Sequence, residues 1–273
     1  GVVSLPVSTA FAAPDAAKIA ERKARKSQAV GEKVGKAIGK AYELYGANQI
    51  AEAIAILEPL EPTNAFDKAY LARFLGSLYV EKNPEKAIKY LKEAIKPDIL
   101  SFTDQAAALR NLADLSIMAK KYQDAIGYYN KWLDFTGELD PNVEMRIANC
   151  FYEMKQYNKV IAPADRAIAH FKEPKKEPYI MKYASYYELK QTKKVIEVLE
   201  EAVVIFPKEK TFWVQLGNFY SADEQFAKAL AVIDMAYKQG YLTTENEIKL
   251  LANLYNNNNV PYKAAATLET HMK

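Results

Sequence analysis

Three asparagines, Asn149, Asn218 and Asn253, are spaced along the sequence so that their amide side chains could bind a ligand together. They occupy the same place in three similar helical segments of the chain. An amide side chain both donates and accepts hydrogen bonds, so a spaced row of amides suits the backbone of an extended peptide. The structural alternative is that these side chains only tolerate exposure or bond across neighbouring helices.

Residue types with catalytic or metal-binding chemistry form no matching constellation. His170 and His271 each stand alone at a predicted helix end, without Cys, Asp or Glu at metal-ligand spacing on a shared face. The sequence contains no glycine-rich phosphate loop, no G-x-S-x-G motif and no Cys-His set. The single cysteine, Cys150, is interpreted as a small buried packing residue. The sequence therefore predicts a non-enzymatic protein without a metal or cofactor.

Helical hairpins are the elements that would position the amides. Residues 211–240, TFWVQLGNFYSADEQFAKALAVIDMAYKQG, contain two short amphipathic helices with a polar break between them. One hairpin cannot bury its own apolar face, so it predicts copies of itself. A small or β-branched residue that opens the second helix recurs at intervals of 34, 38, 35, 35, 34 and 35 residues, as Ala53, Ala87, Ala125, Val160, Val195, Ala229 and Ala264.

The pattern inside residues 211–240 resembles the tetratricopeptide repeat signature. It has the order W-x2-L-G-x2-Y, given by Trp213, Leu216, Gly217 and Tyr220, and then Ala229 in the second helix. Gly217 and Ala229 are small where two helices must cross closely. We therefore expect an all-α fold, a right-handed superhelical solenoid of about seven tetratricopeptide-like helical hairpins. The 50% content of hydrophobic residues is ample for its core.

A solenoid of this kind is expected to form a concave groove lined by the first helix of every repeat. The predicted groove residues, a third of a turn from the core face, are Tyr70, Arg73, Ser77, Arg110, Asp114, Met145, Asn149, Tyr152, Ile180, Ala184, Tyr187, Val214, Asn218, Ser221, Lys249, Asn253 and Asn256. Lys249 with Asn253 also resembles half of the carboxylate clamp of some tetratricopeptide proteins. No matching Lys and Arg follow in a later repeat, so capture of a C-terminal carboxylate is not predicted.

The first residues of the chain differ in character from the repeats. Residues 1–13 are apolar and end in Ala10-Phe11-Ala12-Ala13, which is typical of a secretory signal peptide and its cleavage site. A disordered apolar tail or a fragment of a membrane anchor are the alternatives, although thirteen residues are too few to span a bilayer. We expect a signal-peptide remnant at 1–13, export to the periplasm and no stable membrane insertion of the mature chain.

Residues 14–30 are rich in Lys, Arg and Ala and are interpreted as a basic linker, with a partner-binding or membrane-surface arm as the alternative. The expected solenoid covers residues 31–273, and we expect it to continue beyond Lys273 because a polar capping helix is missing there. The net charge of +3 is too small to demand nucleic acid or an anionic membrane.

Several stretches outside the general repeat pattern carry a closer resemblance. They are NPEKAIKYLKEAI, KEPKKEPY, VIEVLEEAVVIFPKEKTFWVQLGNFY and GYLTTENEIKLLANLYNNNNVPYKAAATLE. The chain from about residue 30 resembles the exported tetratricopeptide proteins encoded beside TonB, ExbB and ExbD genes in gammaproteobacteria. The resemblance implies a periplasmic adaptor of TonB-dependent uptake, with TonB, ExbB or ExbD components or a TonB-dependent receptor as its partner. A chaperone-like envelope-assembly factor that binds extended polypeptides and an adaptor for a cell-wall enzyme are the alternatives.

Overall fold

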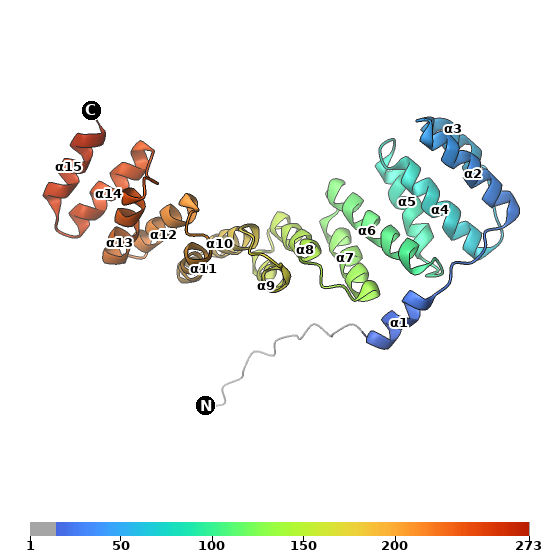
Figure 1. Ribbon diagram of the computed structural model, residues 1–273, viewed down its shortest axis with the longest axis horizontal. Helices are drawn as coiled ribbons and strands as arrows, with labels where there is room; N and C mark the ends of the chain where they lie inside the picture. Colours follow the sequence, from blue (N-terminus) through green and yellow to red (C-terminus); the bar gives the residue numbers. More distant parts are fainter. Residues whose placement is uncertain (1–14, 273) are drawn as a thin grey trace. The chain divides into compact units, whose positions relative to one another are not determined.

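Apolar residues at helical spacing, interrupted by short polar breaks, produce a chain of helices. The computed structural model describes residues 15–272, and within them it contains fifteen α-helices, one short 3-10 helix and no strand (Figure 1). The predicted all-α class is therefore confirmed. No helix in this part of the chain has both the length and the apolar content needed to cross a membrane. The predicted signal-peptide remnant, residues 1–13, lies outside the described residues.

The chain divides into two units at Asp140, and each is described by itself. In the first unit a short helix precedes three hairpins, which pair α2 with α3, α4 with α5 and α6 with α7. The helices are α1 (Ala16–Ala24), α2 (Glu32–Gly46), α3 (Ile50–Leu57), α4 (Ala65–Tyr79), α5 (Pro84–Ile95), α6 (Phe102–Met118) and α7 (Tyr122–Thr136).

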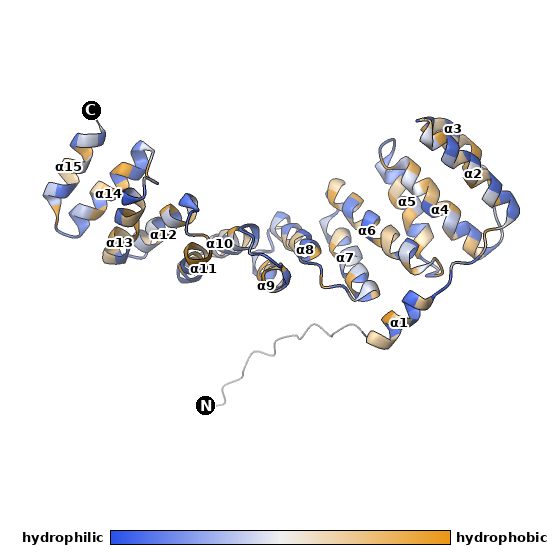
Figure 2. Ribbon diagram, in the orientation of Figure 1, coloured by the Kyte–Doolittle hydropathy of each residue, from blue (hydrophilic) through white to orange (hydrophobic). Residues whose placement is uncertain are grey.

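The second unit contains four hairpins, which pair α8 with α9, α10 with α11, α12 with α13 and α14 with α15. Its helices are α8 (Pro141–Glu153), η1 (Tyr157–Lys159), α9 (Ile161–His170), α10 (Glu177–Glu188), α11 (Thr192–Ile205), α12 (Lys210–Ala222), α13 (Phe226–Lys238), α14 (Glu245–Asn257) and α15 (Pro261–His271). Figure 2 shows apolar and polar residues alternating along these helices, the pattern of amphipathic elements that bury one face.

The seven residues that mark the second helices in the sequence form the spine of the core. Each of them, from Ala53 to Ala264, is at most 2% exposed. Gly217 lies at a close helix crossing, as predicted, because a Cβ there would meet Ile233 of the paired helix. Gly76 is small for the same reason, since a Cβ there would lie 2.8 Å from Cγ of Leu91. The phase of the repeats read from the sequence is therefore confirmed by the packing.

The turn inside six hairpins of the described chain has one backbone form. Its central residue has a left-handed conformation, with φ between 58° and 60°, at Asn48, Lys120, Lys155, Lys190, Glu224 and Asn259. In the sixth hairpin the backbone N–H of Gln225 donates to the carbonyl of Tyr220 at 2.8 Å, and that of Glu224 donates to Ser221 at 3.0 Å. These two bonds define a Schellman motif, which ends one helix and lets the next begin immediately.

Tyrosine and carboxylate pairs link successive hairpins within each unit. In the first unit the hydroxyl of Tyr79 in α4 donates to Glu58 at the end of α3, and in the second unit Tyr255 donates to Asp234 at 2.7 Å. The bond from Tyr79 is the main reason that the pKa of Glu58 lies below its usual value. Burial and then the bond to Glu58 raise the pKa of Tyr79 to about 12. Each pair thus joins a first helix to the preceding second helix.

Helix α1 lies in the segment that the sequence analysis assigned to a basic linker, residues 14–30. It packs against α6 and α7. The guanidinium of Arg22 donates to the carbonyl oxygens of Asp134 at 2.9 Å and Phe135 at 3.3 Å, near the end of α7. Arg25 pairs with the Asp98 carboxylate at 3.0 Å through both of its terminal nitrogens. Part of this basic segment is therefore an ordered helix that caps the third hairpin.

Candidate functional site

The predicted groove residues lie on the first helices of their hairpins and fall into two sets. Those from Tyr70 to Asp114 belong to α4 and α6 in the first unit, and those from Met145 to Asn256 belong to α8, α10, α12 and α14 in the second. We call the faces that these residues occupy the first-helix surface of each unit. Each surface is described separately.

The two arginines predicted for the first unit are engaged in contacts between helices. Arg73 in α4 forms an ion pair with Asp104 in α6 at 3.4 Å, and Arg110 forms one with Asp140 at 3.3 Å. The guanidinium of Arg110 also lies 5.0 Å from the ring of Trp132. Both side chains are a little more than one quarter exposed. They therefore brace the hairpins and have little capacity left for a ligand.

The first unit has a hollow of about 680 Å³ at the C-terminal ends of α2, α4 and α6. Two predicted residues, Ser77 and Asp114, line it together with Tyr45, Asn111 and Met118, which the sequence analysis missed. Tyr45 is 53% exposed and Met118 is 69% exposed. A sequence signal existed for Tyr45 and Met118. Each is a largely apolar side chain in the last turn of a first helix, at a position that the repeat core does not use. The hollow combines polar groups with uncovered apolar surface.

Tyr70 and Asp114 in the first unit are held by neighbouring aromatic residues. Tyr70 is partly buried, and its ring lies 5.8 Å from that of Phe66. Asp114 accepts a hydrogen bond from the hydroxyl of Tyr129 in the paired helix α7. The phenol fixes the orientation of the Asp114 carboxylate at the edge of the hollow.

The second unit has the predicted row of asparagines. Asn149, Asn218 and Asn253 follow the small core residues of α8, α12 and α14, so they share one register position. Asn218 and Asn253 are exposed and Asn149 is partly exposed. None of the three amides forms a hydrogen bond within residues 15–272. The alternative interpretation, in which these side chains bond across neighbouring helices, therefore does not apply to the described residues. In α10 the same position holds Ala184, which interrupts the row.

Apolar and aromatic side chains lie on the same surface. Tyr187 and Ile180 in α10 are 59% and 41% exposed. The Tyr187 ring contacts Phe219 of α12 edge to face, with centroids 5.8 Å apart, and this contact fixes its position. Burial is the main cause of the raised pKa of Tyr152, which contacts Tyr157. Anchored rings beside free amides give the surface both apolar and hydrogen-bonding contact points.

Lys249 in α14 forms an ion pair with Glu245 one turn earlier, at 2.8 Å. Both side chains are more than half exposed, so solvent screens the pair and it contributes little to the stability of the helix. A ligand carboxylate can therefore replace Glu245 at little cost. Asn253 and Asn256 on the same helix are exposed as well.

The nucleophilic and metal-binding residue types are placed as packing elements. Burial raises the pKa of the Cys150 thiol to about 11, so the reactive thiolate is scarce at neutral pH. The ring of His271 packs edge to face on Tyr237, and its Nε2 lies 2.6 Å from the Tyr237 hydroxyl. In the described part of the chain no three His, Cys, Asp or Glu residues are grouped to hold a metal ion.

Comparison with known proteins gives a fold and no closer relative. No family model matches the chain, and no curated protein matches it. A tetratricopeptide repeat protein from Parabacteroides merdae ATCC 43184 is similar in structure, with a TM-score of 0.50 and 16% identity over 88% of this chain and 92% of that one. A mutant of MamA matches with the same score and identity over 63% of this chain and 91% of that chain. MamA AMB-1 also has a TM-score of 0.50 at 16% identity, over 64% and 93%.

Matches at this identity show the fold alone. They confirm the prediction of a helical repeat solenoid, because proteins of the tetratricopeptide type share the helical hairpin array described above.

Proposed function

We propose that this chain, which has a fold of the tetratricopeptide type, is a non-enzymatic scaffold that binds an extended segment of a partner protein. The binding site is the first-helix surface of the second unit. The observation that carries the proposal is the row of amides at Asn149, Asn218 and Asn253, which are accessible and unbonded in the described chain. Backbone groups of an extended peptide would meet these amides, and its side chains would contact Tyr187 and Ile180.

The surface suits a peptide better than a small molecule. Its polar groups are spread along three helices, and its apolar contacts are single exposed residues. An extended chain makes many weak contacts of this kind along its length, whereas a small ligand needs them to converge in one enclosed pocket.

The finer proposal is that the protein works in the periplasm as an adaptor of a TonB-dependent transport system. Its support is the resemblance of the sequence stretches, above all residues 240–269, to exported tetratricopeptide proteins encoded beside TonB, ExbB and ExbD. The partner would then be a component of that energy-transducing set or a TonB-dependent receptor.

Photo-crosslinking in living cells of the host tests both levels of the proposal. A photoreactive amino acid replaces Tyr187 on the first-helix surface, and a matched control replaces Lys89, an exposed residue of the second helix α5. We expect one dominant product from position 187, identified by mass spectrometry as a TonB-system protein, and none from position 89. Many unrelated envelope proteins would favour a chaperone-like factor instead, and equal products from both positions would refute the site.

A further inference from the structure

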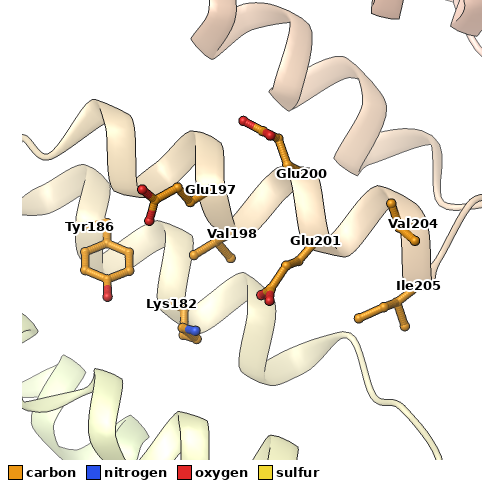
Figure 3. A pocket seen from close by; sticks show the side chains of 8 residues that line it. All are labelled: Lys182, Tyr186, Glu197, Val198, Glu200, Glu201, Val204 and Ile205. Atoms are coloured by element: carbon orange, nitrogen blue, oxygen red, sulfur yellow. The ribbon is translucent and has the colours of Figure 1, made fainter.

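The second unit has a hollow of its own, between the first helix α10 and the second helix α11. It has a volume of about 600 Å³ and we call it the α11 groove (Figure 3). The lining residues come from α10 and α11 and are Lys182, Tyr186, Glu197, Val198, Glu200, Glu201, Val204 and Ile205. None of them belongs to the predicted groove residues of the first helices.

One end of the α11 groove is apolar and uncovered. Val204 is 78% exposed and Ile205 is 38% exposed, and Figure 3 shows both projecting from the last turn of α11. Two adjacent β-branched residues at the exposed end of a helix have low helix propensity and bury little in the folded chain. Exposed apolar residues of this kind are typical of a surface that a binding partner covers.

The same place in the third hairpin is covered by a helix of this chain. The core markers Ala125 and Val195 are 70 residues apart, so Val204 and Ile205 in α11 correspond to Asp134 and Phe135 in α7. Helix α1 lies at that position in the first unit.

Two arginines of α1 make that contact. The guanidinium groups of Arg22 and Arg25 lie 5.2 and 5.6 Å from the centre of the Phe135 ring, and Arg22 donates to the last carbonyls of α7. The chain itself therefore shows how a basic amphipathic helix docks at the end of a second helix.

The two positions differ in charge. Three glutamates, Glu197, Glu200 and Glu201, line the α11 groove, where α7 has Gly127, Asn130 and Lys131. The one lysine in the lining, Lys182, is already paired with Asp165 at 2.7 Å, and Glu197 is paired with Lys194 at 3.4 Å.

Glu201 forms no ion pair within residues 15–272. The groove thus has a net negative rim beside its apolar end, and it complements a cationic and aliphatic partner.

We propose that the α11 groove is the docking site for a basic amphipathic helix of a partner protein, which docks at the end of a second helix as α1 does. In the α1 contact the arginines meet Asp134 and Phe135, whereas Ile19 lies beside Gly137. In the α11 groove the contacts follow the local residues instead: an aliphatic side chain packs on Val204 and Ile205, and a Lys or Arg one turn later pairs with Glu201. The spacing is that of Ile19, Arg22 and Arg25 in α1, an aliphatic residue followed by basic residues at i+3 and i+6.

The test is a titration of the full chain with a synthetic peptide of residues 15–26, DAAKIAERKARK, with blocked ends and a fluorescent label. Binding is followed by fluorescence anisotropy at low salt. In the full chain α1 already occupies its own site on α7, which leaves the α11 groove open to the added peptide. A peptide of the same composition in scrambled order is the control for non-specific charge attraction.

Two variants locate the site. Glu201→Lys and Val204→Ser are expected to weaken binding roughly tenfold each, because the first reverses the charge at the rim and the second removes the apolar contact. Both residues are exposed, so the fold should be retained, which circular dichroism checks. The matched control Glu52→Lys, at an exposed position of α3, should leave the affinity unchanged. Equal affinity of all the proteins, equal binding of the scrambled peptide, or no binding at all would overturn the proposal.

Discussion

Gly217 and Ile233 are in direct contact where α12 crosses α13. A Cβ on Gly217 would lie 2.2 Å from Cδ1 of Ile233, and Ile233 is fully buried. The absence of a side chain at Gly217 therefore sets the distance between the two helices of this hairpin.

Replacing Gly217 should destabilise the second unit. We expect Gly217→Ala to lower the free energy of unfolding by about 1–3 kcal/mol, and Gly217→Leu by more, because Ile233 has no space to move into. Gly127 is the matched control, since it is exposed in α7 and a Cβ there would meet nothing within 4 Å. Gly127→Ala should stabilise by about 0.5–1 kcal/mol. Chemical unfolding measures both, and equal effects of the two substitutions would show that the crossing is not close.

The hairpin turns predict a stabilising glycine. Lys190 has φ of 59° between α10 and α11, a conformation that costs an L-residue roughly 1–2 kcal/mol relative to the right-handed region. We therefore expect Lys190→Gly to raise the midpoint of thermal unfolding. Lys89→Gly, at an exposed interior position of α5, should lower it, since glycine costs about 1 kcal/mol in a helix. A fall in the midpoint for both variants would contradict the assigned turn.

Stability should depend on pH through Tyr79 and Glu58. The pKa of Glu58 is lowered by the bond from Tyr79, so this contribution is complete above the unfolded value of 4.5 and is lost as pH falls through the folded pKa. The pKa of Tyr79 is raised to about 12, so its contribution is complete below 10.0 and is lost as pH rises toward 12.

Tyr79→Phe is the variant that isolates this bond. Between about pH 5 and pH 10 it should lower the free energy of unfolding by about 1 kcal/mol, a value kept small because Glu58 is partly solvated. The difference from the parent protein should shrink on either side of that window. Urea unfolding across the pH range measures it, and a difference that stays constant with pH would refute the assignment.

Helix α1 should detach when its arginines are removed. Arg22→Ala with Arg25→Ala deletes the bonds to the end of α7 and to Asp98, together with both contacts on Phe135. Amide hydrogen exchange in residues 16–24 should then become fast while α6 and α7 keep their protection. Lys18→Ala with Lys26→Ala is the control, because neither lysine forms an ion pair or hydrogen bond through its side chain in the described chain. Unchanged exchange in the arginine variant would show that other contacts hold α1.

The hairpins were predictable because their signals are local. Apolar spacing, the small residue at Gly217 and the recurring markers from Ala53 to Ala264 lie within stretches of about 35 residues, and each marker is buried as expected. The position of α1 was not predictable in the same way. Its partners Asp98 and Phe135 lie far along the chain. The Lys- and Arg-rich sequence of the segment does not indicate which residues it will contact.

For the surface residues too, local features were predictable and contacts between hairpins were not. Asn218 and Asn253 were placed on an accessible face because helix periodicity alone decides exposure. The pairing of Arg73 with Asp104 depends on how neighbouring hairpins stack, which periodicity does not specify. Met118 was missed because it lies one turn beyond Asp114, the last predicted position of α6, and Tyr45 was missed because no position of the first hairpin was included in the predicted groove.

The most direct test of the peptide-binding proposal is a calorimetric titration of the partner segment captured through position 187. It compares the parent protein with Asn149→Ala, Asn218→Ala and Asn253→Ala combined, and with a control that combines Asn130→Ala and Asn158→Ala on helices outside the first-helix surface. We expect the triple variant to lose affinity by about tenfold or more, with unchanged helicity, and the control variant to bind as the parent protein does. Undiminished binding by the triple variant would contradict it.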